Sequence, residues 1–339
     1  MTTTKRSLAK STDNLPLIRL SAINPFLLEL SRRRADAGEL LRKMNLPDDI
    51  PASAEVFVSA QSIYEFVERS ADAANDPYLG FSIGQSLELH DWEPIAQAAA
   101  EAQSVGELLN RFIAYALDFS SSTRFFLKTE GDHSVFGFRR IIDPVVEAAQ
   151  NDAFYLGFLA RLLMRATRDR WDSSLVLFKV ANPEVIPQQP EQLRIVQGDN
   201  RGIQVRFPTE WLFERFEKSS FHDPGSTAGP AQMPESLTGS LRLALLPHLH
   251  ELDLTAERAA EKCGYKHRKL SRMLRKKDTT IGKEIAKLRA ERAGKELAQS
   301  DRRIADIALS VGFKDPTVFS RAFKNWTGQS PQNYRRTHR

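Results

Sequence analysis

The chain has 339 residues, of which 41% are apolar and 27% charged, so its composition is that of a folded protein of two or three domains. It contains no run of about 18 uncharged apolar residues, and its first residues, MTTTKRSLAKST, lack an apolar core. We therefore expect neither a membrane span nor a secretion signal, and a soluble protein of the cytoplasm. The single cysteine, Cys263, excludes an internal disulfide framework and a zinc site built from several cysteines.

The charge is divided unevenly along the chain. Residues 1–236 contain 25 lysines and arginines against 32 aspartates and glutamates, whereas residues 237–339 contain 23 against 11. An overall charge of +5 thus hides an acidic body of −7 and a basic segment of +12. A basic module of this size is typical of a protein that binds a polyanion, although a basic face without a partner is the alternative.

Residues 15–216 mix helix and strand patterns without regular alternation. Apolar spacing predicts helices in 22–44 and 59–74, a helix that Ser104 and Glu107 open as a capping box, and a long helix over about 145–170. Strand-like runs at 123–128 and 134–138 surround a hairpin turn, further strands are expected at 175–180 and 203–207, and a short helix at 211–216. We predict an α+β domain here, after a flexible N-terminus over residues 1–14.

Residues 217–236 read EKSSFHDPGSTAGPAQMPES and are rich in Ser, Gly and Pro. This composition predicts a flexible linker. Beyond it strong helix formers dominate, so an all-α domain is expected over residues 237–339.

The basic segment repeats itself. The two copies are AEKCGYKHRKLSRMLRK and, about 48 residues later, ALSVGFKDPTVFSRAFKN. Each has a small residue four positions before a glycine, an aromatic after the glycine, and then an apolar-Ser-Arg triplet. This pattern predicts two helix-turn-helix units in which the glycine makes the tight turn. The expected core positions are Ala260, Gly264, Tyr265, Leu270, Ala308, Gly312, Phe313 and Phe319.

The second helix of each unit leaves one face available for a DNA major groove. Arginine there can bond a guanine edge with two hydrogen bonds, and serine or threonine can reach bases or phosphates. A helix over 281–298, about 27 Å long, would hold the two units roughly one DNA turn apart, and a rod slightly too short would bend the DNA. Two helical hairpins with merely solvated faces are the alternative, which the duplication within a segment of charge +12 disfavours.

The stretch RRIADIALSVGFKDPTVFSRAFKNWTGQSPQNYRR resembles the C-terminal signature of the AraC/XylS family of bacterial transcription regulators, and residues 241–336 follow that family's double helix-turn-helix. The resemblance implies a sequence-specific transcriptional regulator, an activator, with reading helices at 266–276 and 316–325. It assigns base reading to Arg268, Ser271, Arg272, Pro316, Thr317, Ser320 and Arg321. Pro316 lacks the polar side chain that is frequent there, so it is expected to start the helix. Phosphate contacts are expected from Lys266, Lys269, Arg275, Lys276, Lys277, Lys324, Arg335 and Arg336.

The phrases NPFLLELSRRRADAGELLRKMNLPDD and SAQSIYEFVERSADAANDPYLGFSIGQSL resemble the arabinose-binding-like effector domain of the subgroup that includes ornithine-utilisation regulators. After about Leu87, HDWEPIAQAAAEAQSVGELL replaces the phrase usual in that subgroup. The resemblance implies a small organic effector, a homodimer through this domain and contact with RNA polymerase. The sequence does not identify the effector pocket. Aromatic residues that fit either a pocket or an ordinary core are Phe112, Tyr115, Phe119, Phe125, Phe126, Phe136, Phe138 and Phe154.

Other patterns predict no catalysis, cofactor or metal. His248 and His250 lie two apart in a helical context, which places them on different faces and favours packing over metal binding. The run HDWE at 90–93 has no nucleophile or oxyanion glycine beside it, so helix capping is the better interpretation. Gly80 and Gly84 indicate close helix packing, and Cys263 a small core residue before a redox sensor. A sequence-indifferent DNA-bending protein and an enzyme fused to a DNA-binding tail remain the alternatives.

Overall fold

The computed structural model describes residues 14–44, 46–47, 56–89, 91–188, 193–215, 233–234 and 236–338. The chain forms two compact units, Pro16–Met233 and Pro234–Arg339, the latter joined by Met1–Leu15. Residues 1–13 of the expected N-terminus and 217–232 and 235 of the expected linker lie outside the described residues. Among the described helices, none has the length and apolar character to cross a membrane.

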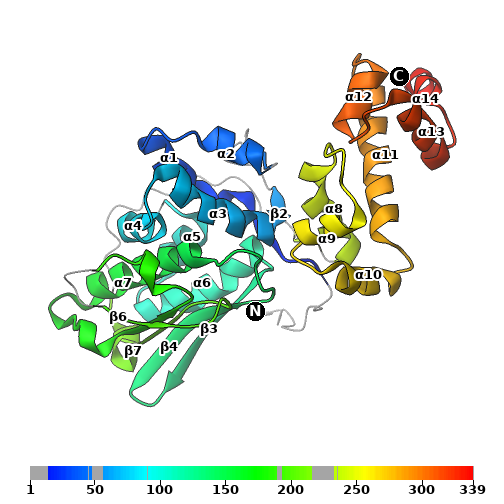
Figure 1. Ribbon diagram of the computed structural model, residues 1–339. Helices are drawn as coiled ribbons and strands as arrows, with labels where there is room; N and C mark the ends of the chain where they lie inside the picture. The colour runs from blue at the N-terminus through cyan, green and yellow to red at the C-terminus, as the bar shows by residue number, and fades with distance from the viewer. Residues whose placement is uncertain are drawn as a thin grey trace. The chain divides into compact units, whose positions relative to one another are not determined.

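The first half of unit Pro16–Met233 is mainly helical (Figure 1). A small antiparallel pair joins β1 (Leu17–Arg19) to β2 (Phe57–Ser59). The helices are η1 (Leu20–Ile23), α1 (Asn24–Arg32), α2 (Ala37–Lys43), α3 (Ala60–Ala74), α4 (Leu79–Ser86), α5 (Glu93–Glu101) and α6 (Val105–Phe119). At the start of α6 the Ser104 hydroxyl accepts from the Glu107 amide at 3.3 Å, which confirms Ser104 as the predicted N-cap. The Glu107 carboxylate accepts in return from the Gln103 amide at 2.8 Å, one residue before the backbone N–H that a capping box normally uses.

The second half adds a five-stranded sheet, ordered β3-β4-β7-β5-β6. Its strands are β3 (Thr123–Glu130), β4 (His133–Arg140), β5 (Leu177–Val180), β6 (Arg194–Gln197) and β7 (Gln204–Pro208); β5 and β6 run parallel and the other pairs antiparallel. The predicted hairpin is confirmed, with Gly131 in the left-handed region of its turn. Helix α6 contacts β3 and α7 (Ala149–Thr167) contacts β5, so the helices cover one face of the sheet. Short 3-10 turns η2 (Arg168–Arg170), η3 (Ser173–Leu175), η4 (Pro183–Val185) and η5 (Thr209–Phe213) complete the unit.

The long helix predicted from about residue 145 begins only at 149, and the prediction was wrong for its first turn. Side-chain amides satisfy the backbone there instead. The Gln61 side chain accepts from the Val145 amide at 3.0 Å, and Asn200 accepts from Ala148 and donates to the Val146 carbonyl, each at 3.0 Å. Because these groups already have partners, the segment stays non-helical. The short helix expected at 211–216 is η5, which ends at Phe213; Phe216 lies outside the described residues.

Helices α4 and α7 pack unusually closely, as the Gly80 and Gly84 spacing predicted. A Cβ atom at Gly80 would lie 2.1 Å from the Gln150 carbonyl oxygen, and one at Gly84 would lie 2.1 Å from that of Phe154. On the facing helix, a Cβ at Gly157 would lie 2.5 Å from the Phe81 carbonyl oxygen. Only glycine permits this backbone approach.

The described part of the C-terminal unit is entirely helical, as predicted. Its helices are α8 (Leu237–Leu245), η6 (Leu246–His248), α9 (Ala256–Lys262), α10 (His267–Arg275), α11 (Ile281–Gln299), α12 (Ile304–Ser310), α13 (Pro316–Thr327) and α14 (Pro331–Thr337). Helix α11 contacts α8, α9 and α10 as well as α12, α13 and α14, and Figure 1 shows the two groups around its two halves. Near the start of the chain, the Asn14 amide donates to the Pro234 carbonyl at 3.1 Å, and the Leu15 N–H donates to the Ser240 hydroxyl at 2.9 Å.

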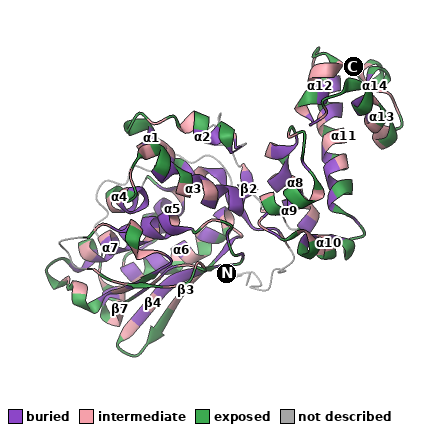
Figure 2. Cartoon of the chain, viewed as in Figure 1, coloured by how far each residue is buried: buried purple, intermediate pink, exposed green. Residues whose placement is uncertain are grey.

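Buried residues in this unit line the inner faces of the helices (Figure 2). On α11, Ile281, Ile285 and Leu288 are buried in the first half, and Ala293 and Leu297 in the second. Ala286 and Ala290, in the middle of the helix, are only half-buried. The apolar face of α11 thus forms two separate contacts, one for each helix-turn-helix unit.

Candidate nucleic-acid interface and ligand cavity

The two sequence repeats fold into two turns with the same hydrogen bonds. Gly264 and Gly312 have φ angles of +72° and +80°, in the left-handed region. In the first copy the Tyr265 N–H donates to the Ala260 carbonyl at 2.9 Å, and in the second the Phe313 N–H donates to the Ala308 carbonyl at 2.8 Å. Both alanines are fully buried. The small residue, the glycine and the aromatic therefore form one repeated device, which ends the first helix and starts the second.

The inner face of each second helix is buried. Leu270 and Leu274 anchor α10, and Phe319 and Phe323 anchor α13, all with no exposed surface. Around α13 the core includes Ala293 and Leu297 of α11 together with Ile307, Ala308 and Val311; Phe313, Trp326 and Tyr334 pack against it. These buried side chains fix the orientation of each second helix, so its opposite face points to the surface.

The outer face of α10 carries a row of exposed cations. Arg268, Arg272, Arg275, Lys276 and Lys277 are all exposed. The Ser271 hydroxyl lies 3.2 Å from Nε2 of His267 and is half-buried. Lys269 lies over the ring of Tyr265, 4.7 Å from its centroid. Arg268, Arg272 and Arg275, spaced by four and three residues, thus share one face of α10, whereas Lys276 and Lys277 follow its last residue and Lys266 directly precedes its first.

Helix α13 begins with a strong cap. One carboxylate oxygen of Asp315 accepts from the Thr317 amide at 2.6 Å and from the Val318 amide at 3.4 Å, while Pro316 occupies the first turn. Pro316, Thr317, Arg321 and Lys324 are exposed. The Ser320 hydroxyl donates to the Pro316 carbonyl at 2.8 Å, which leaves its oxygen as an acceptor for DNA.

Two of the predicted phosphate contacts are held by the protein itself. The Arg335 guanidinium donates to the Arg302 carbonyl and its Nε is buried without a hydrogen-bond partner among the described residues. Arg336 is exposed and donates to the Asn333 side chain at 3.2 Å. Arg335 therefore fixes α14 near the start of α12, whereas Arg336 keeps more of its surface open.

Val318 is a candidate contact that the sequence reasoning missed. It follows Thr317 in the first turn of α13, and 52% of its surface is exposed. Apolar side chains on a reading helix can contact the methyl group of thymine. Because Val318 directly precedes the buried Phe319, no local signal in the sequence separated it from the core.

The charges of this unit fall into two groups. Several cations on or directly before α8, α9, α11 and α12 have acidic partners: Arg242 pairs with Glu291, Arg258 with Asp253, Lys262 with Glu251, Lys287 with Glu284, Arg302 with Glu296 and Arg303 with Asp306. In contrast, Arg268, Arg272 and Arg275 form no ion pair with any described residue, and neither α10 nor α13 contains an acidic residue. Part of the positive charge of the scaffold is thus paired with acidic side chains, whereas the three arginines of α10 are not paired in the part of the chain that the structure describes.

His248 is a packing residue, as expected. It is buried, and its Nδ1 lies 2.8 Å from the Glu251 carboxylate, which Lys262 also contacts at 3.2 Å. Burial lowers the pKa of His248. Although burial opposes ionisation of Glu251, the hydrogen bond with His248 and the charge of Lys262 lower its pKa to about 2. Within the described ranges no three His, Cys, Asp or Glu side chains gather in a metal-binding group.

Cys263 lies beside the first turn with only 1% of its surface exposed, and burial raises the pKa of its thiol. A buried thiol with a raised pKa is a poor nucleophile. The small-core interpretation therefore fits its position.

The N-terminal unit contains a cavity between its helices and its sheet. The centre of a water-sized sphere can move through about 60 Å³ of this cavity. Its walls come from β1, η1, α1, α3, α5, α6, α7, β3 and β4, and aromatic and aliphatic side chains dominate them. Five of the eight aromatics that the sequence offered for a pocket line it: Phe112, Phe119, Phe125, Phe138 and Phe154. Tyr115, Phe126 and Phe136 do not.

Trp92 and Tyr155, which the sequence reasoning did not place in a pocket, lie in the cavity wall. Their rings meet edge to face with centroids 5.6 Å apart, and the ring of Tyr155 lies 4.8 Å from that of Phe138. Trp92 directly precedes α5 in an extended conformation, which carries its indole inward and away from the helix start. His90, in the same HDWE run, lies outside the described residues, and Asp91 accepts from the Glu88 amide at 3.2 Å.

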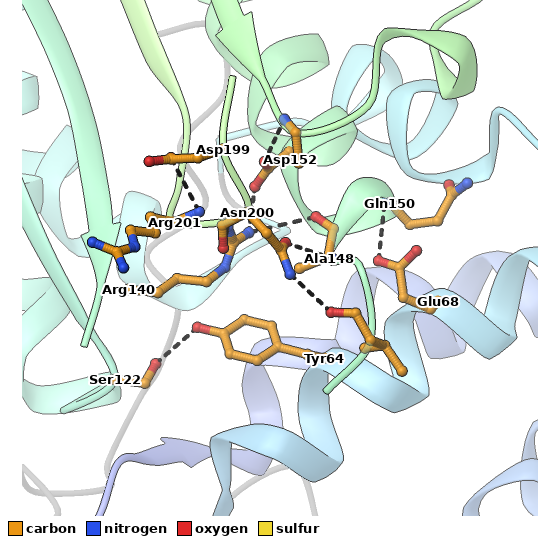
Figure 3. Close-up of polar contacts among 12 residues, drawn as sticks. Tyr64, Glu68, Ser122, Arg140, Ala148, Gln150, Asp152, Asp199, Asn200 and Arg201 are labelled. Carbon is orange, nitrogen blue, oxygen red and sulfur yellow. Dashed lines mark hydrogen bonds and ion pairs between the residues drawn. The ribbon is translucent and has the colours of Figure 1, made fainter. Parts of the chain in front are cut away.

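A buried polar network supports one side of this cavity (Figure 3). Arg140 of β4 forms an ion pair with Asp152 of α7, and their side chains are 0% and 1% exposed. The guanidinium also lies 5.2 Å from the ring centroid of Tyr64, whose hydroxyl bonds Ser122 at 3.2 Å. Tyr64 and Ser122 line the cavity, so the network fixes part of its polar wall.

Two family models match the chain. One describes a helix-turn-helix domain and matches residues 247–337. The other describes the N-terminal arabinose-binding domain of AraC transcription regulators and matches residues 35–193. The chain belongs to the AraC family of transcription regulators.

Individual AraC-family relatives match parts of the chain. Transcriptional activator NphR of a Rhodococcus species is 30% identical over 113 residues, which are 33% of each protein. The ornithine utilization regulator of Pseudomonas aeruginosa is 29% identical over 149 residues, 40% of this chain and 44% of the relative. The raffinose operon regulatory protein RafR of Pediococcus pentosaceus is 42% identical over 60 residues, 18% of this chain and 22% of the relative. The matches thus span less than half the length of these relatives.

Two solved structures are also similar to parts of this chain. The C-terminal domain of AraT from Geobacillus stearothermophilus is 34% identical and covers 30% of this chain and 84% of its own, with a TM-score of 0.28. The regulator CdpR of Pseudomonas aeruginosa is 18% identical and covers 90% of this chain and 97% of its own, with a TM-score of 0.33.

Proposed function

We propose that this AraC-family protein is a sequence-specific transcriptional regulator that binds double-stranded DNA through α10 and α13 and responds to a small molecule in its N-terminal unit. The observation that carries this proposal is the distribution of charge: six scaffold cations have acidic partners, whereas Arg268, Arg272 and Arg275, which follow one another along α10, have none among the described residues. Exposed cations without partners on a helix are available to phosphates and guanine edges.

The two reading helices suit two successive major-groove segments. They belong to turns of the same construction and share α11, whose 19 residues are about 28 Å long. Successive major-groove segments on one face of a duplex lie about 34 Å apart. We therefore expect two half-sites about one helical turn apart on the DNA, with some bending of the duplex.

Selection of preferred sites from random duplexes, followed by footprinting, tests this function. The expected result is a motif with two short conserved blocks and two protected patches centred about 10 base pairs apart. Protection without preferred bases would instead indicate a sequence-indifferent DNA-bending protein. Protection of a single short patch would refute simultaneous binding by both units.

We further propose that the protein acts in the cytoplasm as a homodimer through unit Pro16–Met233, and that it activates transcription in contact with RNA polymerase. The family resemblance supports these points. Light scattering of the full chain measures the oligomeric state, and a reporter fused to the selected site measures the sign of regulation. No reaction is proposed for the N-terminal unit, since the relatives are transcription regulators.

A further inference from the structure

The cavity of the N-terminal unit combines aromatic walls with two polar groups that have no partner. The indole N–H of Trp92 is buried and makes no hydrogen bond within the described part of the chain. The Tyr155 hydroxyl, which also faces the cavity, forms no hydrogen bond with another described residue, and burial raises the pKa of this phenol. Tyr155 nevertheless keeps part of its surface accessible, as expected of a side chain that faces an internal space.

Unpaired buried donors are costly, and a ligand that accepts their hydrogen bonds removes the cost. Three other hydroxyl groups of the wall, those of Tyr64, Ser120 and Ser122, bond one another. The Ser122 hydroxyl bonds both Tyr64, at 3.2 Å, and Ser120, at 2.8 Å. Beside the polar side chains of Thr123 and Asn151, which also line the cavity, the wall thus presents the donors of Trp92 and Tyr155 to a ligand.

The wall contains no Lys, Arg, His, Asp or Glu side chain among the described residues. Two buried cations lie behind rings of the wall, Arg140 behind Tyr64 and Arg19 behind Phe119. Each already has an acidic partner, Asp152 and Glu93 respectively. A carboxylate in this cavity would lose its hydration without gaining a counter-charge, which is strongly unfavourable. A sugar, with several hydroxyl groups, would find too few polar partners.

The available space fits one ring. The edges and faces of Phe112, Phe125, Phe138 and Phe154 surround it, and Trp92 contacts Phe112 and Phe154 with centroids 5.7 Å and 5.3 Å apart. The volume of about 60 Å³ counts only positions of the sphere's centre, so the space that atoms can fill extends about 1.4 Å further on every side. That space accommodates a single aromatic ring with a short substituent.

We infer that this cavity binds a small, uncharged aromatic molecule that carries a hydrogen-bond-accepting oxygen, with Tyr155 as the specificity-determining donor and Trp92 beside it. This inference rests on the proposed function only in taking the cavity as the effector site. It names the chemical class of the effector and excludes carboxylates and sugars.

Three probes of similar size separate the contributions: acetophenone has a neutral acceptor, benzoate has a charged one, and ethylbenzene has none. Binding to the full-length protein is measured by calorimetry and by tryptophan fluorescence. Acetophenone is expected to bind at least tenfold more tightly than benzoate. Because Trp92 is the tryptophan in the described wall, the fluorescence change is expected to disappear in Trp92→Phe.

The decisive variant is Tyr155→Phe, which removes one hydroxyl and keeps the ring. It should weaken acetophenone binding about tenfold, the loss expected for one hydrogen bond, and leave ethylbenzene binding unchanged. Unchanged ethylbenzene binding also shows that the cavity is intact. Tyr78→Phe, at an exposed tyrosine outside the cavity, is the matched control and should change neither affinity.

Three results would overturn the inference: benzoate binding as tight as acetophenone binding, an unchanged acetophenone affinity in Tyr155→Phe, or no acetophenone binding at millimolar concentrations. The site selection on DNA needs no ligand. A failed ligand test alongside a recovered DNA motif would refute the cavity assignment and leave the DNA-binding function standing.

Discussion

Arg272 and Arg321 occupy corresponding positions in the two repeats. Each follows the serine of the apolar-Ser-Arg triplet, and each lies exposed on a helix whose opposite face is fully buried. The buried residue two positions earlier, Leu270 or Phe319, determines where the arginine points. Position in the repeat and direction in the structure thus agree, which makes these two arginines the best candidates for reading bases.

We expect Arg272→Ala and Arg321→Ala each to lose about 1–3 kcal/mol of binding free energy on the selected site, because a bidentate contact to a guanine edge is lost. Binding to random DNA should change little. Competition binding against the selected and a shuffled duplex measures both quantities. Equal losses on the two duplexes would show that these arginines contact the backbone.

Lys276→Ala is the comparison variant at the end of α10. A phosphate contact carries no sequence information, so this change should weaken binding to every duplex similarly. It should also reduce the slope of affinity against salt concentration by about one ion. A loss confined to the selected site would contradict its assignment to phosphate.

Single residues were predicted best in the sequence repeat, where each position occurs in two copies. The eight expected core positions of the two units all lie in the turns or on the inner faces, because turn geometry and helical period follow from local sequence. Trp92 and Tyr155 were missed because their importance comes from elements that meet only in three dimensions. Nothing in the local sequence distinguishes Tyr155 from an ordinary residue of a buried helix.

Short strands that pair with distant segments were not predicted from the sequence either. Strands β1 and β2 have three residues each and pair across about 40 residues, and β6 pairs in parallel with β5. Runs of three residues carry too little periodicity to be read. The β3–β4 hairpin, in contrast, was predictable because its pattern and turn are contiguous. The start of α7 was misplaced because amides of Gln61 and Asn200, far away in sequence, bind the backbone there.

The turn between α12 and α13 depends on the positive φ angle of one residue, Gly312. Gly312 has a φ of +80°, and a Cβ there would lie 2.6 Å from the Leu249 carbonyl oxygen and 2.8 Å from that of Glu251. Gly312→Ala should therefore lower the free energy of unfolding by about 2 kcal/mol or more. Chemical denaturation of the full chain, followed by circular dichroism, measures the change.

Gly282→Ala is the matched control on α11. A Cβ at Gly282 would meet nothing within 4 Å, and the position is helical and exposed. Alanine there should stabilise the helix by about 0.5–1 kcal/mol. Equal effects of the two alanines would show that the turn does not require a left-handed residue.

The ion pair between β4 and α7 tests the link between sheet and helix. Asp152→Ala leaves the Arg140 guanidinium buried without its counter-charge, and also removes the acceptor for the Ala181 amide at 3.2 Å. We expect a loss of about 3–5 kcal/mol in the free energy of unfolding. Asp143→Ala breaks the exposed pair with Arg201 and should cost less than about 1 kcal/mol. Similar losses for the two variants would contradict a supporting role for the buried pair.

At the scale of the whole molecule, two units of opposite net charge share one chain. The body carries the ligand cavity and an excess of acidic residues, whereas the basic segment carries the reading helices. An acidic body does not compete for DNA, so the electrostatic attraction is confined to the unit that reads the sequence. The two units also differ in their response to pH, because their buried titratable groups have pKa values shifted in opposite directions.

In the N-terminal unit, burial raises the pKa of Glu68 to about 8, although the Gln150 amide donates to its carboxylate at 2.9 Å. A carboxyl with a raised pKa binds its proton more tightly in the folded state than in the unfolded state. Its contribution to the free energy of unfolding is therefore present below the ordinary pKa of 4.5 and is lost as the pH rises toward about 8.

In the C-terminal unit, His248 and Glu251 both have lowered pKa values, so their contribution to the free energy of unfolding is present near neutral pH. It is lost as the pH falls below the ordinary values of 6.5 and 4.5.

We therefore expect the two units to change stability in opposite directions with pH. Hydrogen exchange of the full chain, corrected for the intrinsic pH dependence of the exchange rate, resolves them separately. Amides of α3 and α7 should become less protected between about pH 5 and pH 8, and amides of α9 and α11 less protected as the pH falls from about 6 to 4. Glu68→Gln should remove the first trend and leave the second, and Glu251→Gln should weaken the second and leave the first. Parallel trends in both units would refute the opposed assignment, because a common response requires titrating groups other than these three.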